Sequence, residues 1–236
     1  MSDAPVFAAT RAELQRVATH VLARRRHDVT GKLGLRATPG GFGTPAFGPD
    51  VEVLRVSGTA LVRERAGEVA VTAVAGSSLS ALARFAEVDL TAPFDAGHDT
   101  PALGDVDAPI VIDAGHAAVV ADWFARGWAA LDVASAAAES PKAVQLWPEH
   151  FDAGTSVALG AGPDDRCNLG VSPGDAAHDE PYLYVGPWGA DRPDDPAYWN
   201  APFGAVVVRS AILAESDPAV AALRFFQRGL ALLSRR

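Results

Sequence analysis

The sequence has a single cysteine, Cys167, among its 236 residues. One cysteine excludes an internal disulfide, and it also excludes the paired cysteine spacing of a zinc finger. No stretch approaches the roughly 18 or more apolar residues of a membrane-spanning helix, and the first residues lack the basic and apolar parts of a signal peptide. We therefore expect a cytoplasmic chain with no membrane partner.

Sequence motifs of catalysis and nucleotide binding are absent as well. No Walker, GxSxG or HExxH sequence occurs. The glycine-rich stretch "GGFGTPAFG" (40–48) lacks the GK[ST] ending and the following helix of a phosphate-binding loop. The sequence therefore contains no nucleotide-binding motif and leaves the cofactor and the enzymatic activity open.

Charge is distributed unevenly along the chain. Residues 1–90 carry 11 Lys/Arg and 9 Asp/Glu, whereas the remaining residues carry 9 and 20, and the formal net charge is -9. The acidic second part disfavours nucleic acid and anionic membranes as partners. The one basic run, "ARRRHD" (23–28), ends a helical pattern, so we expect it to cap a helix rather than to bind phosphate.

The length and the 49% hydrophobic content predict a large core in a single compact domain, 1–236. A segment rich in Pro, Gly and Asp near 92–107 marks a possible internal boundary between halves 1–91 and 108–236. Thr10 and Glu13 form a capping-box pattern, which predicts that the first helix starts there.

Helical and strand patterns are segregated along the rest of the chain. Strand-like patterns occupy 29–37, 51–74 and several stretches between 143 and 213. Helical spacing starts at about Ser78 and follows Asp113 and Asp217, which we expect to be N-caps. This order favours an α+β fold with antiparallel sheets from two meanders and long helices packed on them. We expect three large side chains to be buried between helices and sheets: Trp123, Phe124 and Phe226.

The turn "SPGDAAHDE" (172–180) carries more ionisable side chains than a turn requires. If 151–159 pairs with 167–171 across the loop between them, the numbers of paired residues sum to about 325. His150 then lies opposite about Asp175. We therefore predict that five candidate catalytic side chains converge at one end of the sheet: His150, Asp152, Asp175, His178 and Glu180.

Two kinds of chemistry fit such a group. Imidazoles and carboxylates can hold a divalent metal with an open position for water, or a His paired with a carboxylate can act as a general base. Asp175 and Asp179 are also ordinary turn formers, which would make the group structural. Aromatic residues of the same strands are candidates for the walls of a small-molecule pocket: Trp147, Tyr182, Tyr184 and Trp188.

A resemblance to a known family rests on segments such as "TGKLGLRATPGGFGTPAF", "SPKAVQLWPEHFDAGTSVALG" and "NLGVSPGDAAHDEPYLYVGPW". Over nearly its whole length the chain resembles an uncharacterised family of bacterial proteins of unknown function. The most specific shared pattern is carried by Trp147, Phe151, Asp152, Pro173 and Gly174. The chain departs from the family pattern at "GGFG" (40–43), where the family has a Trp-bearing stretch. Its histidines are a second departure from that pattern. The resemblance implies an architecture and no particular reaction.

Two functions follow from these patterns. The first is a cytoplasmic small-molecule-binding protein, with enzymatic activity left open, whose polar and aromatic pocket lies at one sheet end. The alternative is a non-catalytic structural or protein-interaction domain. The ligand, the reaction and the oligomeric state are not encoded in any motif of the sequence.

Overall fold

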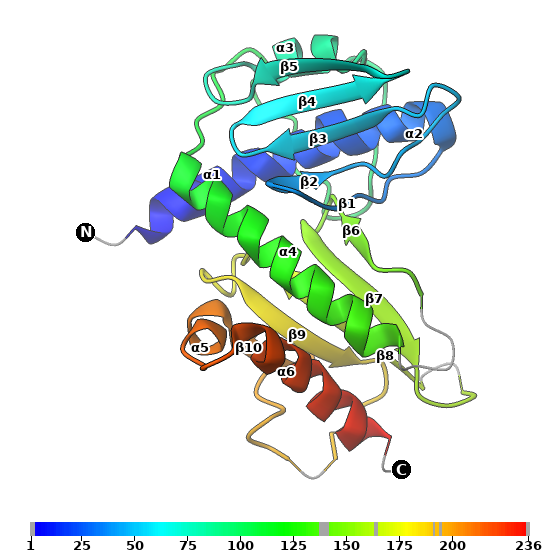
Figure 1. The fold of residues 1–236 in the computed structure, drawn as a ribbon, viewed down its shortest axis with the longest axis vertical. Helices are drawn as coiled ribbons and strands as arrows, with labels where there is room; N and C mark the ends of the chain where they lie inside the picture. The colour runs from blue at the N-terminus through cyan, green and yellow to red at the C-terminus, as the bar shows by residue number, and fades with distance from the viewer. Residues whose placement is uncertain (1–2, 137–141, 163–164, 191, 194, 235–236) are drawn as a thin grey trace. The chain divides into compact units, whose positions relative to one another are not determined.

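A computed structural model describes residues 3–136, 142–162, 165–190, 192–193 and 195–234 (Figure 1). Its strands form two five-stranded antiparallel sheets, of order β1-β2-β3-β4-β5 and β10-β9-β8-β7-β6, which confirms the predicted α+β class. Contacts divide the chain into a first unit, 1–125 with 146–151, and a second unit, 126–145 with 152–236. The segment 92–107 lies inside the first unit. No helix of the described ranges is both long and apolar enough to cross a membrane.

The first unit begins with one uninterrupted helical run. It consists of α1 (Ala4–Val17), the π-helical η1 (Ala18–Ala23) and α2 (Arg24–Thr30). Pro5 stands in the first turn, where its missing amide hydrogen costs nothing, so the helix starts before Thr10. The predicted capping box is therefore wrong. The Thr10 hydroxyl accepts from the amide of Asp113 at 3.0 Å, and Glu13 pairs with Arg16 at 2.7 Å.

The sheet of the first unit lies beside this helical run (Figure 1). Its strands are β1 (Arg36–Thr38), β2 (Gly41–Gly43), β3 (Val53–Ser57), β4 (Ala60–Arg65) and β5 (Glu68–Ala73). The predicted meander at 51–74 is confirmed, whereas the predicted strand at 29–37 begins later because the helix continues to Thr30. Leu54, Val56 and Leu61 are buried on one face, and η1 packs against β2.

A network of ion pairs joins the helical run to this sheet. Glu52 is 3% exposed, and it accepts hydrogen bonds from Arg25 at 2.9 Å and Arg63 at 3.0 Å. Both arginines and Arg65 also pair with Glu87. The hydrogen bond from Arg63 is the main reason that the pKa of Glu87 falls to about 2. The basic run at 23–28 therefore contributes to buried ion pairs, a role beyond the helix capping that its position predicts.

The helical run also holds the segment 92–105 through a row of cationic and imidazole side chains. Arg16, His20 and Arg24 recur every four residues and donate to backbone carbonyls of this segment at 2.8, 2.7 and 2.5 Å. The His20 ring is 4% exposed, and its Nδ1 atom has no hydrogen-bond partner among the residues described. Nε2 carries the hydrogen that the carbonyl of Pro101 accepts, and a second proton is disfavoured because it would lie on the buried, unpartnered Nδ1 atom.

Burial of His20, together with Arg24 and Arg16, lowers the pKa of His20 below its ordinary value of 6.5. The native state therefore binds fewer protons than the unfolded state below pH 6.5, and stability falls as the pH decreases. We expect the free energy of unfolding to decrease between pH 7.5 and 5.5, by at most about 1.4 kcal/mol per pH unit from one group. Urea denaturation at each pH measures this decrease. His20→Gln keeps a donor for the carbonyl and does not titrate, so an equally steep decrease in that variant would contradict the assignment.

The remaining helices of the first unit start at side-chain caps, of which Asp113 was predicted. The Ser78 hydroxyl accepts from the amide of Ala81 at the start of α3 (Leu79–Phe85). The Asp113 carboxylate accepts from the amide of His116 at 2.8 Å at the start of α4 (Ala114–Ala136), which continues into the second unit.

The core of the first unit contains the predicted aromatic side chains of α4. Trp123 and Phe124 are 1% and 0% exposed, which confirms their predicted burial. The Phe124 ring meets those of Phe42 and Phe151 edge to face, with centroids 6.2 and 5.4 Å apart. Such pairs contribute beyond the area that they bury.

Trp123→Ala should therefore leave a large cavity in this core and lower the free energy of unfolding by about 3–5 kcal/mol. Trp147→Ala is the matched control, because Trp147 belongs to the same unit and is 44% exposed. Chemical denaturation of both variants measures the difference. Equal losses for the two variants would contradict the packing described.

The second unit is built from a hairpin meander and two helices. Its elements are β7 (Asp152–Ala158), β8 (Arg166–Ser172), β9 (Tyr182–Pro187), β10 (Ala205–Val208), α5 (Arg209–Leu213) and α6 (Pro218–Leu233). The fifth strand of this sheet, β6 (Gln145–Trp147), has its last two residues in the first unit. Ala153 pairs with Val171, so paired numbers in β7 and β8 sum to 324, within one residue of the predicted register. Asp217 caps α6 as predicted, and Phe226 is buried. Residues 209–213, predicted as strand, are helical.

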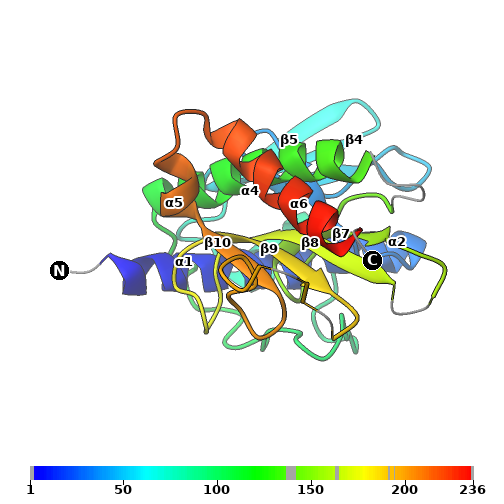
Figure 2. The same cartoon turned by 90° about the horizontal axis from the view of Figure 1, so that it is seen from below.

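One face of this sheet is covered by α4 and α6, which lie on the same side of it (Figures 1 and 2). Val171 and Val185 are fully buried on this face. A Cβ atom on Gly127 of α4 would come within 2.4 Å of the Val171 side chain, so only glycine permits this close approach. Cys167 is buried on the same face, and burial raises the pKa of its thiol to about 12.

Candidate functional site

The turn between β8 and β9 is closed by Asp175. One of its carboxylate oxygens accepts from the amides of Ala177 and His178, at 2.7 and 2.8 Å. The amide of Asp175 in turn donates to the carbonyl of His178 at 2.8 Å. The second carboxylate oxygen accepts from the hydroxyl of Tyr182 at 2.6 Å. Asp175 is thus the turn former that its position predicts, and it also binds the first residue of β9.

Tyr184 reaches across one strand, β8, to a second carboxylate. Its hydroxyl donates to Asp152 at the start of β7, at 2.6 Å. The ring crosses β8 over Gly170, where a Cβ atom would lie 2.1 Å from the ring carbon that bears the hydroxyl. The hydrogen bond between Tyr184 and Asp152 therefore requires glycine at 170.

Asp152, Asp175, Tyr182 and Tyr184 form what we call the tyrosine–aspartate cluster. Because Ser172 pairs with Tyr182 and Gly170 with Tyr184, the two tyrosines lie on one face, opposite the face that carries Val171 and Val185. A row of rings continues along it, with centroids 4.7 Å apart for His178 and Tyr182, 6.2 Å for the two tyrosines and 6.2 Å for Tyr184 and Phe203.

The electrostatics of the cluster fix its protonation. Burial, followed by the bond to Asp175, raises the pKa of Tyr182. Burial and Asp152 raise the pKa of Tyr184 well above its ordinary value. Burial alone would raise the pKa of Asp175, but its hydrogen bonds from Tyr182 and from two amides lower it. At neutral pH the phenols therefore act as hydrogen-bond donors rather than as bases, and Asp175 is an anion.

The other predicted catalytic residues have separate partners. Glu180 accepts from the amide and the hydroxyl of Ser210, and so caps the short helix α5. This cap explains why residues 209–213 are helical. His178 Nδ1 lies 3.6 Å from Asp175, beyond hydrogen-bond distance. The structure therefore brings together Asp152, Asp175 and His178, through the two tyrosines, and places Glu180 at α5.

His150 belongs to the first unit, where its Nδ1 atom lies 2.9 Å from Asp99. Its Nε2 atom lies 4.0 Å from Glu149, a carboxylate that is 7% exposed. His98 lies 3.1 Å from the same oxygen of Asp99. The sequence analysis missed Asp99, because nothing in the spacing of residues so far apart in the chain indicates that they pair.

The four aromatic residues predicted to line a pocket also lie in different places. Tyr182 and Tyr184 belong to the cluster. Trp188 lies beyond the opposite end of β9, where its indole donates to Asn168 at 2.9 Å and the guanidinium of Arg166 stacks on it. Trp147 is an exposed residue of β6 in the first unit. Phe203 was not among the predicted walls. Its place just before β10, the strand that pairs with β9, is the sequence signal that could have indicated it.

No group of three or more His, Cys, Asp or Glu side chains in the described part of the chain is arranged to hold a metal ion.

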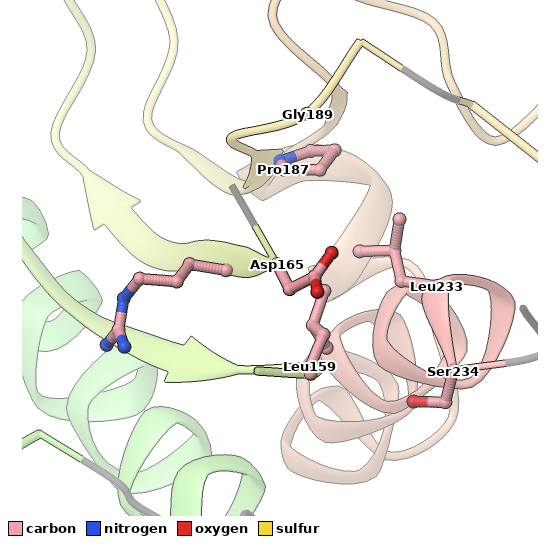
Figure 3. A pocket seen from close by; sticks show the side chains of 8 residues that line it. Leu159, Asp165, Pro187, Gly189, Leu233 and Ser234 are labelled. Atoms are coloured by element: carbon pink, nitrogen blue, oxygen red, sulfur yellow. The ribbon is translucent and has the colours of Figure 1, made fainter. Parts of the chain in front are cut away.

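A cavity of about 240 Å³ lies at the other end of the sheet from the cluster (Figure 3). In this view Asp165, between β7 and β8, lies across from Leu233 of α6. The Asp165 carboxylate accepts from the amide of Gly162 at 2.9 Å, so it stabilises the loop to which it belongs. The cavity is also smaller than the roughly 300–1,000 Å³ of ordinary ligand sites, so it is a weak candidate for a ligand site.

Comparison of the chain with models of known families, with curated proteins and with solved structures gives no match.

The close contact between the Tyr184 ring and Gly170 allows a mutational test of the cluster's geometry. Gly170→Ala should displace the ring, break the bond to Asp152 and destabilise the protein by about 1–3 kcal/mol. In a Tyr184→Ala background the same substitution should cost much less, because the clashing ring is gone. Denaturation of the four proteins of this double-mutant cycle measures the coupling. The control Gly186→Ala meets only atoms at 3.8 Å or beyond. Additive losses in the cycle would contradict the geometry.

Proposed function

We propose that the chain is a small-molecule-binding protein and that the tyrosine–aspartate cluster forms the polar part of its site. The observation that carries the proposal is the pair of 2.6 Å hydrogen bonds from Tyr182 and Tyr184 to two carboxylates on one sheet face. The phenols hold both carboxylates in fixed positions, as a binding site requires.

The chemistry of the cluster favours a ligand with an organic cation, such as a primary amine or a guanidinium. Asp175 is anionic at neutral pH, and carboxylates form strong charge-assisted hydrogen bonds with such groups. The rings of His178 and Phe203 flank the tyrosines, and aromatic faces attract cations. The acidic second part of the chain also attracts a cationic ligand at long range.

One observation in the first unit favours an enzyme. The Asp99 carboxylate contacts Nδ1 of His150, an arrangement that orients an imidazole and makes its Nε2 atom available as a general base. Glu149 stands 4.0 Å from that Nε2 atom. A ligand that binds to the protein and is then converted in a reaction abolished by His150→Gln would support catalysis. A ligand recovered unchanged would support a binding protein.

The alternative, a non-catalytic structural or interaction domain, is favoured by the local roles of the same side chains. Asp175 closes its turn and Glu180 caps α5. In this alternative, variants of the cluster change stability and nothing else.

A thermal-shift and calorimetric screen distinguishes the small-molecule-binding function from the structural or interaction alternative. The probes are putrescine, agmatine, arginine and choline, with succinate and 1,4-butanediol as anionic and neutral controls of similar length. We expect one or more of the cations to raise the melting temperature, because binding to the native state stabilises it, and both controls to leave it unchanged. Asp175→Asn should weaken that binding at least tenfold, in line with the about 1.5–3 kcal/mol of a charged hydrogen bond.

Tyr198→Phe is the matched control for Tyr184→Phe. The hydroxyl of Tyr198 donates to a carbonyl of α6 at 2.8 Å in the same unit, away from the cluster. Tyr184→Phe should weaken binding and Tyr198→Phe should not, although both lose a buried hydroxyl. Absence of binding by every cation, or equal effects of the two variants, would overturn the proposal.

A further inference from the structure

The free edge of the first unit's sheet is unusually apolar. β5 is the last strand in the order β1-β2-β3-β4-β5, and all but one of its residues are exposed. Val69 and Val71 are 64% and 62% exposed, and with Val51 and Val111 they are the most exposed large apolar side chains of the described residues. Proteins commonly protect an edge strand with Lys or Pro, and the β5 sequence "EVAVTA" contains neither.

The register shows which backbone groups face outward from this edge. The amide of Val74 donates to the carbonyl of Thr59 at 2.8 Å, and β4 and β5 continue in the same register to the pair Arg65–Glu68. Inward and outward groups alternate along an antiparallel strand. The N–H and C=O groups of Val69 and Val71 therefore point away from β4, toward the position of a further strand.

A cleft of about 470 Å³ lies at the start of β5, between residues 49–51 and 64–69. Val51 stands on one side of it with a backbone φ of 51° and a side chain 65% exposed. A positive φ is unfavourable for a β-branched residue. The amide of Ala66 donates to the carbonyl of Asp50 at 2.9 Å and ties the two sides of the cleft together. Strain of this kind tends to persist where it shapes a contact surface.

The cleft has an excess of negative charge. Asp50, Glu64 and Glu68 line it. Arg65, which also lines it, pairs with Asp50 at 2.7 Å, and Arg55 pairs with Glu64 at 3.1 Å, so the excess comes from Glu68. A basic side chain fits this cleft better than an acidic or a neutral one.

We infer that β5 binds an extended segment of a partner protein, which adds to the sheet as a sixth strand. The partner segment alternates apolar residues, which lie beside Val69 and Val71, and it carries a Lys or Arg that enters the acidic cleft. Backbone hydrogen bonds supply the affinity in this mode of recognition, and the cleft supplies the specificity. A second copy of β5 fits less well, because that strand carries Glu68 and no base.

Fluorescence anisotropy with the full chain tests this inference. The probe is a pool of labelled heptapeptides, Lys-X-Thr-X-Thr-X-Lys, with Val, Ile or Leu at X, and the control pool has Glu in place of both Lys. We expect saturable binding of the Lys pool, at least ten times tighter than that of the Glu pool. Val71→Pro removes one outward N–H and leaves the inward pairs of β5 in place, so it should weaken binding at least tenfold.

A charge reversal tests the cleft without any change to the strand backbone. Glu68→Lys should weaken binding of the Lys pool at least tenfold, whereas Glu215→Lys, an exposed position of the second unit, should leave it unchanged. Melting temperatures establish that each variant is folded.

Three results would overturn the inference. They are no saturable binding of the Lys pool, equal binding by the wild type and the folded Glu68→Lys variant, and a dimer in light scattering that Val71→Pro converts to a monomer. The last result would identify a second copy of the chain as the occupant of the edge.

Discussion

The antiparallel register of β7, β8 and β9 determines which side chains each face of the second unit's sheet presents. In this register Val171 and Val185 lie under α4 and α6, and Asp152, Tyr182 and Tyr184 fall on the opposite face. A shift of one residue would exchange the two faces and place the carboxylates beneath the helices. The same alternation that builds the core therefore also builds the cluster.

The two units stabilise their buried polar groups by different means. In the first unit, Glu52 and His20 are almost fully buried, and each is paired with partners from distant parts of the chain. Loss of one partner from such a pair leaves an unpaired polar group in the interior, which costs more than the pair contributes. In the second unit, the carboxylates of the cluster are half-buried and bound by neutral phenols.

Much of this arrangement could be predicted from the sequence, because it depends on short-range patterns. Alternation and loop length predicted the β7–β8 register to within one residue, and the caps at Asp113 and Asp217 follow from N-cap chemistry. The local patterns failed where a distant partner decides the structure. Thr10 bonds to the amide of Asp113 instead of capping its own helix.

The candidate site shows the same limit. The sequence identified Asp152, Asp175 and the two tyrosines, since they lie on strands whose pairing can be inferred or in the turn between two of those strands. It could not reveal that Glu180 caps α5 or that Asp99 pairs with His150, because each of these contacts depends on how loops approach one another. The π-helical segment η1 was also beyond prediction.

The location of Cys167 has a practical consequence. Its thiol is fully buried on β8, the central strand of the second sheet. Because burial holds the pKa of this thiol near 12, almost no reactive thiolate forms in the native state. A thiol reagent can therefore modify the chain only during excursions in which β8 separates from its neighbours. Because the chain has no other cysteine, the rate of labelling reports the opening of this sheet at one known position, and no probe has to be introduced.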